Sequence, residues 1–101
     1  MSAWDAIRIA PADTVATVLR AVSEGEELRV QSGEGEVRVR AKEAIPFCHK
    51  IALLAHVPNA AILKYGEVIG EAREEIAAGQ HVHVHNLRSR RGRRTAQSSA
   101  P

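Results

Sequence analysis

The chain has 101 residues, which suffices for one small domain with a single hydrophobic core. Only Trp4, Phe47 and Tyr65 are aromatic, so the core must consist of Val, Ile, Leu and Ala, and the stacking platform of an RNA-binding sheet is missing. The net charge is +2, but five arginines crowd into residues 88–94. Without them nine basic residues face twelve acidic ones, so the body carries a charge of −3 and is not expected to bind nucleic acid.

The cysteine content and the hydropathy pattern bear on the cellular compartment. Cys48 is the single cysteine, so it cannot form a disulfide within the chain. The sequence shows no signal peptide and no long apolar run. These features predict a cytoplasmic protein that does not enter the membrane. Cys48 precedes His49, but adjacent residues on a strand point to opposite faces, which argues against a catalytic Cys–His pair.

Residues 14–22 are predicted to form a short amphipathic helix. Asp13 is suited to the N-cap position, and Gly25 follows the run. The apolar residues of this run recur at intervals of three and four, which is the spacing of one helix face: Val15, Val18, Leu19 and Val22.

A β-hairpin is predicted next. Two alternating segments, residues 27–31 and 36–40, flank a glycine-containing stretch of the kind that closes a hairpin. The apolar side chains of the two strands are expected to face the core: Leu28, Val30, Val37 and Val39.

The second half of the chain contains further short apolar segments. Residues 49–54 and 61–65 are predicted as strands, and Pro58-Asn59 as the turn between them. Residues 71–76 are interpreted as a second short helix. The whole pattern predicts a mainly β domain, a compact and partly closed barrel with two short helices.

Three of the five histidines alternate with two valines in residues 81–85. In an extended strand His81, His83 and His85 would line one face, while Val82 and Val84 would line the other and pack against the domain. Imidazoles two residues apart can converge on a transition-metal ion or an anionic substrate. The same alternation is also typical of a solvated edge strand, and the pattern by itself does not decide between the two.

The domain is expected to span residues 1–87, followed by a disordered, arginine-rich tail at residues 88–101. The tail has no apolar periodicity and consists largely of Arg, Ser, Gly, Ala and Gln. Its arginines can bind RNA, a membrane or an acidic partner, or the segment can act only as a solubilising tail.

Three ordered segments, at residues 45–53, 62–72 and 76–86, resemble the small N-terminal domain of the altronate and galactarate dehydratase family. Residues 13–16 are similar to the start of the same domain. This domain also serves as the small subunit of two-subunit members such as sulfolactate sulfo-lyase. The resemblance implies a SAF-type domain with a β-clip fold. It further implies either a stand-alone small subunit with a separately encoded large dehydratase subunit, or a domain excised from a longer chain.

Two departures from the family pattern stand out. Cys48 occupies a position where the family usually has glycine, and residues 56–60 lack the family's glycine turn. The first departure is expected to crowd the groove beside His49, whereas the second changes only a turn.

The resemblance also implies site residues for dehydration of a sugar acid, which requires a base, a cation and an acid. The assembled enzyme is expected to hold iron or another divalent metal, with His83 and His85 as ligands. His49 and Lys50 are the expected catalytic residues. The expected substrate-binding residues are Lys64, Tyr65 and Asn86.

Other roles remain open for several of these residues. Lys64 and Tyr65 can simply close a strand, and Asn86 can cap a turn. His81 ranks below its neighbours because its position varies in the family, and His56, which matches no family motif, is expected at the surface. The alternative function is a non-catalytic SAF module that binds a carbohydrate or a partner. Exposed sheet edges favour a homo-oligomer.

Overall fold

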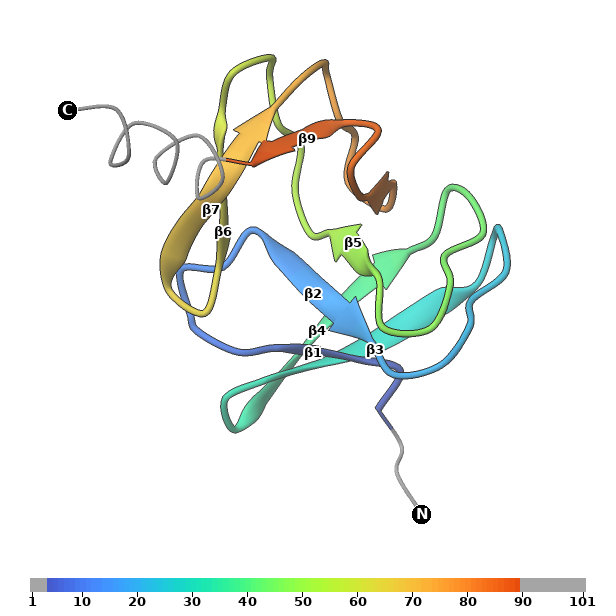
Figure 1. The fold of residues 1–101 in the computed structure, drawn as a ribbon. Coiled ribbons are helices and arrows are strands. Elements are labelled where there is room, and N and C mark those ends of the chain that lie inside the picture. The colour runs from blue at the N-terminus through green and yellow to red at the C-terminus, as the bar shows by residue number, and fades with distance from the viewer. Residues whose placement is uncertain (1–3, 90–101) are drawn as a thin grey trace, which may run out of the picture.

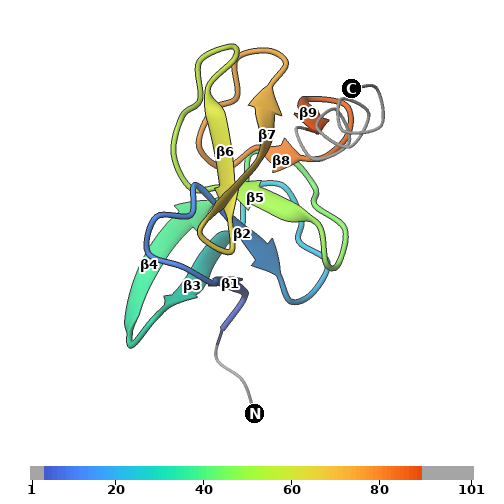
Figure 2. The ribbon, with the colours of Figure 1, turned by 60° about the vertical axis from the view of Figure 1, so that its left-hand side comes forward.

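The computed structural model describes residues 4–89, which form nine strands and no helix. The strands are β1 (Ala6–Arg8), β2 (Val15–Val18), β3 (Glu27–Ser32), β4 (Gly35–Arg40), β5 (Lys50–Ala52), β6 (Ala61–Lys64), β7 (Glu67–Ala72), β8 (His81–Val82) and β9 (Leu87–Ser89). Six strands form one sheet in the order β4-β3-β1-β2-β5-β8, and the other three form a second sheet in the order β6-β7-β9. The smaller sheet lies on one side of the larger one, as Figure 1 and Figure 2 show.

Two hydrophobic clusters make up the core, and the central strands β2 and β5 contribute to both. Val15 and Ala52 belong to the cluster beneath the smaller sheet, together with Val82. Val18 and Ile51 belong to the cluster formed with β3 and β4. Neighbouring residues of a strand point to opposite faces, so one strand can serve two clusters.

The predicted hairpin is confirmed. β3 and β4 pair antiparallel from Glu27 opposite Arg40 to Ser32 opposite Gly35, which leaves a two-residue loop. The inward-facing side chains are those expected, with three buried and the last packed against the cluster: Leu28, Val30, Val39 and Val37.

The predicted helix at residues 14–22 is wrong. This segment contains β2, which lies between β1 and β5 in the larger sheet. Val15, Ala16 and Val18 are all buried, because neighbouring structure covers both faces of the strand. A strand covered on both faces has a continuous apolar run, and such a run also satisfies the spacing of a helix face.

Asp13 therefore caps no helix. Its buried carboxylate accepts hydrogen bonds from the backbone N–H groups of Ala10 at 2.9 Å, Tyr65 at 3.0 Å and Gly66 at 2.7 Å. Asp13 thus holds the turn between β6 and β7 against the segment that leads into β2.

The second predicted helix, at residues 71–76, is also wrong. Its first residues end β7, and Ile76 forms an isolated β-bridge with His56. The mainly β prediction agrees with the structure, whereas the two short helices do not. Within the described part of the chain, no helix is long and apolar enough to cross a membrane.

The same turn geometry occurs at four places in the fold. The turns span residues 23–26, 46–49, 57–60 and 77–80, and each closes with a hydrogen bond from its fourth N–H to its first carbonyl at 3.0–3.2 Å. The third residue of each turn has a positive φ: Gly25, Cys48, Asn59 and Gly79. The turns are unevenly spaced, and two of them lack glycine, so the repeat is not visible as a sequence period.

The last strand extends beyond the expected end of the domain. Arg88 and Ser89 pair with Glu71 and Gly70 in the smaller sheet, although the sequence assigned them to the tail. The rest of the expected tail, residues 90–101, lies outside the described residues.

Candidate functional site

Pairing of β5 with β8 brings two distant histidines together. The antiparallel register places Lys50 opposite Val82 and Ile51 opposite His81. Continued by one residue, the same register places His49 opposite His83, and the centroids of these two rings are 4.0 Å apart. The backbone pairing itself therefore positions His49 beside the histidine-rich segment.

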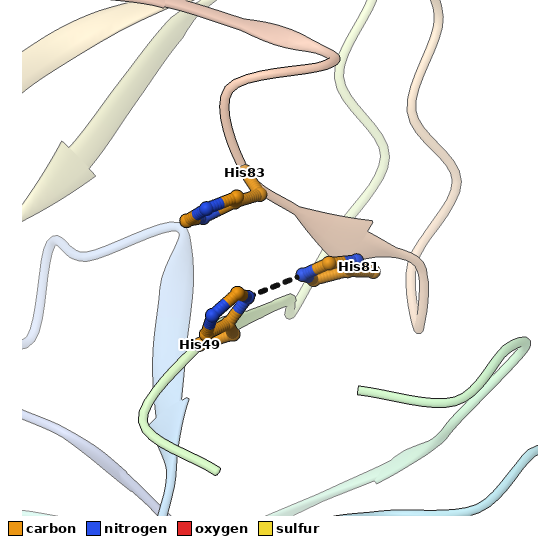
Figure 3. A group of neighbouring side chains, drawn as sticks. All are labelled: His49, His81 and His83. Atoms are coloured by element: carbon orange, nitrogen blue, oxygen red, sulfur yellow. Dashed lines mark hydrogen bonds between the residues drawn. The ribbon is translucent and has the colours of Figure 1, made fainter. Parts of the chain in front are cut away.

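His49, His81 and His83 form one group, called here the three-histidine group (Figure 3). His49 Nδ1 and His81 Nε2 are 2.8 Å apart. One nitrogen from each ring can be chosen so that all three lie within 4.8 Å of one another. All three side chains are half-buried, so the group borders solvent.

The alternation predicted for residues 81–85 holds only as far as His83. After this residue the chain turns, and the N–H groups of Asn86 and Leu87 both donate to the carbonyl of His83. Val82 is fully buried but Val84 is 69% exposed, so the expectation that both valines pack against the domain is wrong for Val84.

His85 lies beside His81 but is not a member of the three-histidine group. His85 is exposed, and its ring is tilted by 45° to that of His81 at a centroid distance of 5.2 Å. Of the two metal ligands expected from the sequence, the structure brings His83 into the group and leaves His85 at its edge.

Asn86 clamps the backbone of this segment. Its side chain is buried, its Nδ2 donates to the carbonyl of His81 at 2.8 Å, and its Oδ1 accepts from the N–H of His83 at 3.0 Å. Glu43 Oε2 accepts from the N–H of His81 at 2.9 Å. Sequence reasoning missed Glu43, because no local pattern connects it with the histidines.

The electrostatic environment favours neutral imidazoles. Burial lowers the pKa of His81, and the positive charges of His49, His85 and His83 lower it further against the opposing effect of Glu43. Burial likewise lowers the pKa of His83, with smaller contributions from His49, Lys50 and His85. Neutral imidazole is the form that binds metal ions.

The positive charge of Lys50 acts on His83, and that of Lys64 acts on Lys50. Burial lowers the pKa of Lys50, and the charge of Lys64 lowers it further. Lys64 Nζ lies 4.8 Å from the centroid of the exposed Tyr65 ring. Among residues 4–89 no ion pair is found for either lysine.

His56 is a core residue, and the prediction that it lies at the surface is wrong. Its side chain is buried, and Nε2 forms a 2.8 Å hydrogen bond with Thr14 Oγ1, which also accepts the N–H of Leu63. The buried Nδ1 has no well-oriented hydrogen-bond partner within the described ranges. Burial therefore lowers the pKa of His56, and the backbone of Leu54 opposes this only in part.

Residues 4–90 match the family model of the altronate/galactarate dehydratase SAF domain. The chain belongs to this family. The resemblance inferred from residues 45–53, 62–72 and 76–86 is thereby confirmed.

The SAF domain is similar to two kinds of named relatives. The altronate dehydratases of Bacillus subtilis and Escherichia coli are each 39% identical to it over 83 residues, which is 82% of this chain but 16% of theirs. The (2R)-sulfolactate sulfo-lyase subunit alpha of Chromohalobacter salexigens is 33% identical over 76 residues, 73% of this chain and 81% of that subunit. The corresponding subunit of Paracoccus pantotrophus is 39% identical over 62 residues, 61% of this chain and 92% of that subunit.

The SAF domain thus presents three imidazoles, one of which is affected by the charge of Lys50. Imidazole nitrogen is a suitable ligand for zinc, copper, nickel and iron ions, and the donor set of the three-histidine group fits such an ion. Lys50 adds positive charge that suits a carboxylate.

Proposed function

We propose that this SAF domain is the small subunit of a cytoplasmic sugar-acid dehydratase, or of a related carbon–oxygen or carbon–sulfur lyase, and that a large subunit completes its site. The proposal depends mainly on the similarity to the alpha subunits of two sulfolactate sulfo-lyases. The aligned region covers 81% of one subunit and 92% of the other. The altronate dehydratase relatives are much longer, and the chain spans only 16% of each.

The chemistry of a dehydration suits the residues gathered here. A base removes the proton next to the carboxylate, and an acid protonates the hydroxyl that leaves as water. We assign these proton transfers to His49 and Lys50. The lowered pKa of Lys50 supports this role, because it brings the ammonium group closer to exchanging its proton near neutral pH.

Lys64 and Tyr65 are the proposed substrate-binding residues. The ammonium group of Lys64 attracts the carboxylate, and the exposed Tyr65 hydroxyl can hydrogen-bond a sugar hydroxyl. Asn86 was expected to bind substrate, but both polar atoms of its side chain bond to the backbone of His81 and His83. Its proposed role is therefore to hold those residues in place.

A divalent metal ion, iron being one candidate, is part of the proposed assembly. His83 and His85 are the ligands expected from the sequence, and the three-histidine group supports a metal role for His83. When bound, the ion supplies positive charge beside the substrate carboxylate.

The test is reconstitution with a large subunit. The pure chain, a separately produced dehydratase-type large subunit and their mixture are each incubated with altronate, galactarate or sulfolactate and a divalent metal, and loss of the acid is followed by NMR. The proposal expects turnover of at least one acid by the mixture and none by the pure chain. Lys50→Met should abolish turnover, while Lys42→Met, at an exposed lysine, should not.

Two outcomes would contradict the proposal. Robust turnover by the pure chain would exclude the two-subunit arrangement. Metal-independent binding of a sugar acid by the pure chain, with no turnover by the mixture, would instead favour a non-catalytic binding module.

A further inference from the structure

The three-histidine group is built within a single chain, with His81 and His83 at alternate positions of one segment and His49 directly before the paired strand β5. The register of β5 and β8 positions His49 opposite His83. Asn86 holds the backbone on both sides of Val82, and Glu43 holds the N–H of His81. The group does not need a second subunit to assemble.

The spacing of the nitrogens is close to what a metal ion requires. A tetrahedral ion with nitrogen ligands at about 2.0–2.1 Å keeps those nitrogens about 3.3 Å apart. Here the three nitrogens lie within 4.8 Å of one another, and one pair is already 2.8 Å apart. Metal binding requires ring rotations that widen the short pair and bring the more distant nitrogens closer.

We propose that this chain alone binds one divalent transition-metal ion through His49, His81 and His83. His81 is the third ligand here, in place of the expected His85. Because His49 also serves as a ligand in this arrangement, the proton transfers proposed for His49 and Lys50 fall to Lys50. The donor set consists of imidazoles without a carboxylate, so the ion class is zinc, nickel, copper, cobalt or iron rather than magnesium or calcium.

A three-imidazole site leaves coordination positions open to solvent. The ammonium group of Lys50, whose charge acts on His83, favours an anionic ligand such as the carboxylate of a hydroxy acid there. This inference rests on the proposed function for the ion's role in the reaction, but metal binding can be tested without any reaction.

The experiment titrates the full, tag-free chain with Zn²⁺ by isothermal calorimetry and with Co²⁺ by visible absorption. One equivalent of each ion is expected to bind. Outer-sphere partners of metal ligands already change affinity 10–100-fold, so His49→Ala, His81→Ala and His83→Ala should each weaken binding by about tenfold or more. His85→Ala is the matched control and should leave the affinity unchanged.

A second measurement needs no variant and guards against misfolding of the mutants. In the wild-type chain, Zn²⁺ should shift the ring ¹⁵N resonances of His49, His81 and His83 as coordination does, while those of His56 and His85 should not show this shift. Absence of saturable binding would overturn the inference. It would also be overturned by an equal loss in the His81→Ala and His85→Ala variants.

The two proposals can fail separately. Metal binding by the pure chain together with an inactive reconstituted mixture would leave the metal site standing and contradict the proposed function. Activity of the mixture without metal binding by the pure chain would support the proposed function and contradict the metal site.

Discussion

At the scale of single residues, Cys48 stands at a backbone position that glycine normally fills. Its φ is 73°, in the left-handed region, and the equivalent residues of two other turns are Gly25 and Gly79. A side chain with a Cβ costs about 1–2 kcal/mol in this region. The glycine expected here from the family pattern therefore has a conformational reason.

Cys48→Gly is predicted to stabilise the chain by about 1 kcal/mol, because it removes this conformational cost. Urea unfolding of the two proteins measures the difference. Ala44→Gly is the matched control: Ala44 is exposed, precedes the same turn and has no positive φ, so this change should destabilise the chain by roughly 0.5–1 kcal/mol. If the Cys48→Gly variant were less stable, the Cys48 side chain would make a contact that stabilises the chain by more than the positive φ costs.

His56 is predicted to make stability depend on pH. Its pKa in the folded chain is lowered by burial, so the unfolded chain binds a proton between the ordinary pKa of about 6.5 and the folded value, whereas the folded chain does not. Its contribution is therefore complete above about pH 6.5 and is lost as the pH falls through the folded pKa.

The measurement compares the wild-type chain with His56→Gln, which cannot titrate. Free energies of unfolding are determined from pH 8 to pH 5, and the other histidines cancel in the comparison because both proteins contain them. The advantage of the wild-type chain should shrink with decreasing pH. A constant difference would mean that His56 titrates alike in the folded and unfolded chains.

At the scale of elements, the recurring turn places glycine under two different constraints. Gly25 and Gly79 share a φ of 92°, but their surroundings differ. A Cβ at Gly79 would collide with the carbonyl oxygen of Arg40, whereas a Cβ at Gly25 would meet no atom within 4 Å in the described structure. Substitutions at these two positions therefore distinguish the cost of a left-handed backbone from the cost of a steric clash.

Gly25→Ala is predicted to cost about 1–2 kcal/mol, the cost of the left-handed backbone for an L-residue. Gly79→Ala should cost more, on the order of 3 kcal/mol or above, because the turn must also move away from the backbone of Arg40. Chemical unfolding of both variants gives the comparison. Equal losses would show that the turn at Gly79 moves freely.

At the scale of the whole molecule, the two hydrophobic clusters are joined by strands that serve both. Val82 belongs to the cluster next to the smaller sheet, whereas Trp4 lies over Arg29 of β3 with the guanidinium 4.6 Å from the ring centroid. β2 and β5 connect the two regions through Val15 and Ala52 on one side and Val18 and Ile51 on the other. The domain is expected to unfold as one cooperative unit.

Val82→Ala should therefore destabilise the region around Trp4 as much as the cluster that contains Val82. The loss of buried methyl groups is expected to cost about 1–3 kcal/mol. Trp4 fluorescence and circular dichroism should report one coincident transition at the lowered midpoint. Val84→Ala, at a side chain that is 69% exposed, should stay within about 0.5 kcal/mol of the wild-type chain. Separate transitions in the Val82→Ala variant would show that the clusters unfold independently.

Local pattern by itself determined part of this architecture. Alternation within residues 27–31 and 36–40, together with the glycine-containing stretch between them, predicted the hairpin, because a strand with one buried face has a period of two. The ordered segments 45–53, 62–72 and 76–86 sufficed to indicate the family, since side-chain identity and order survive where periodicity is ambiguous. The histidine-rich segment was also visible as a candidate site.

Tertiary structure decided the rest. Residues 15–18 form a strand rather than a helix because β1 and β5 pair with its edges and both faces are covered, which no local period reveals. His49 joins His81 and His83 because β5 pairs with β8, although His49 and His81 are 32 positions apart in the chain. His85 is not a member of the group because the backbone turns after His83. Periodicity reports only sequence neighbours, whereas the composition of this site depends on strand pairing between distant segments.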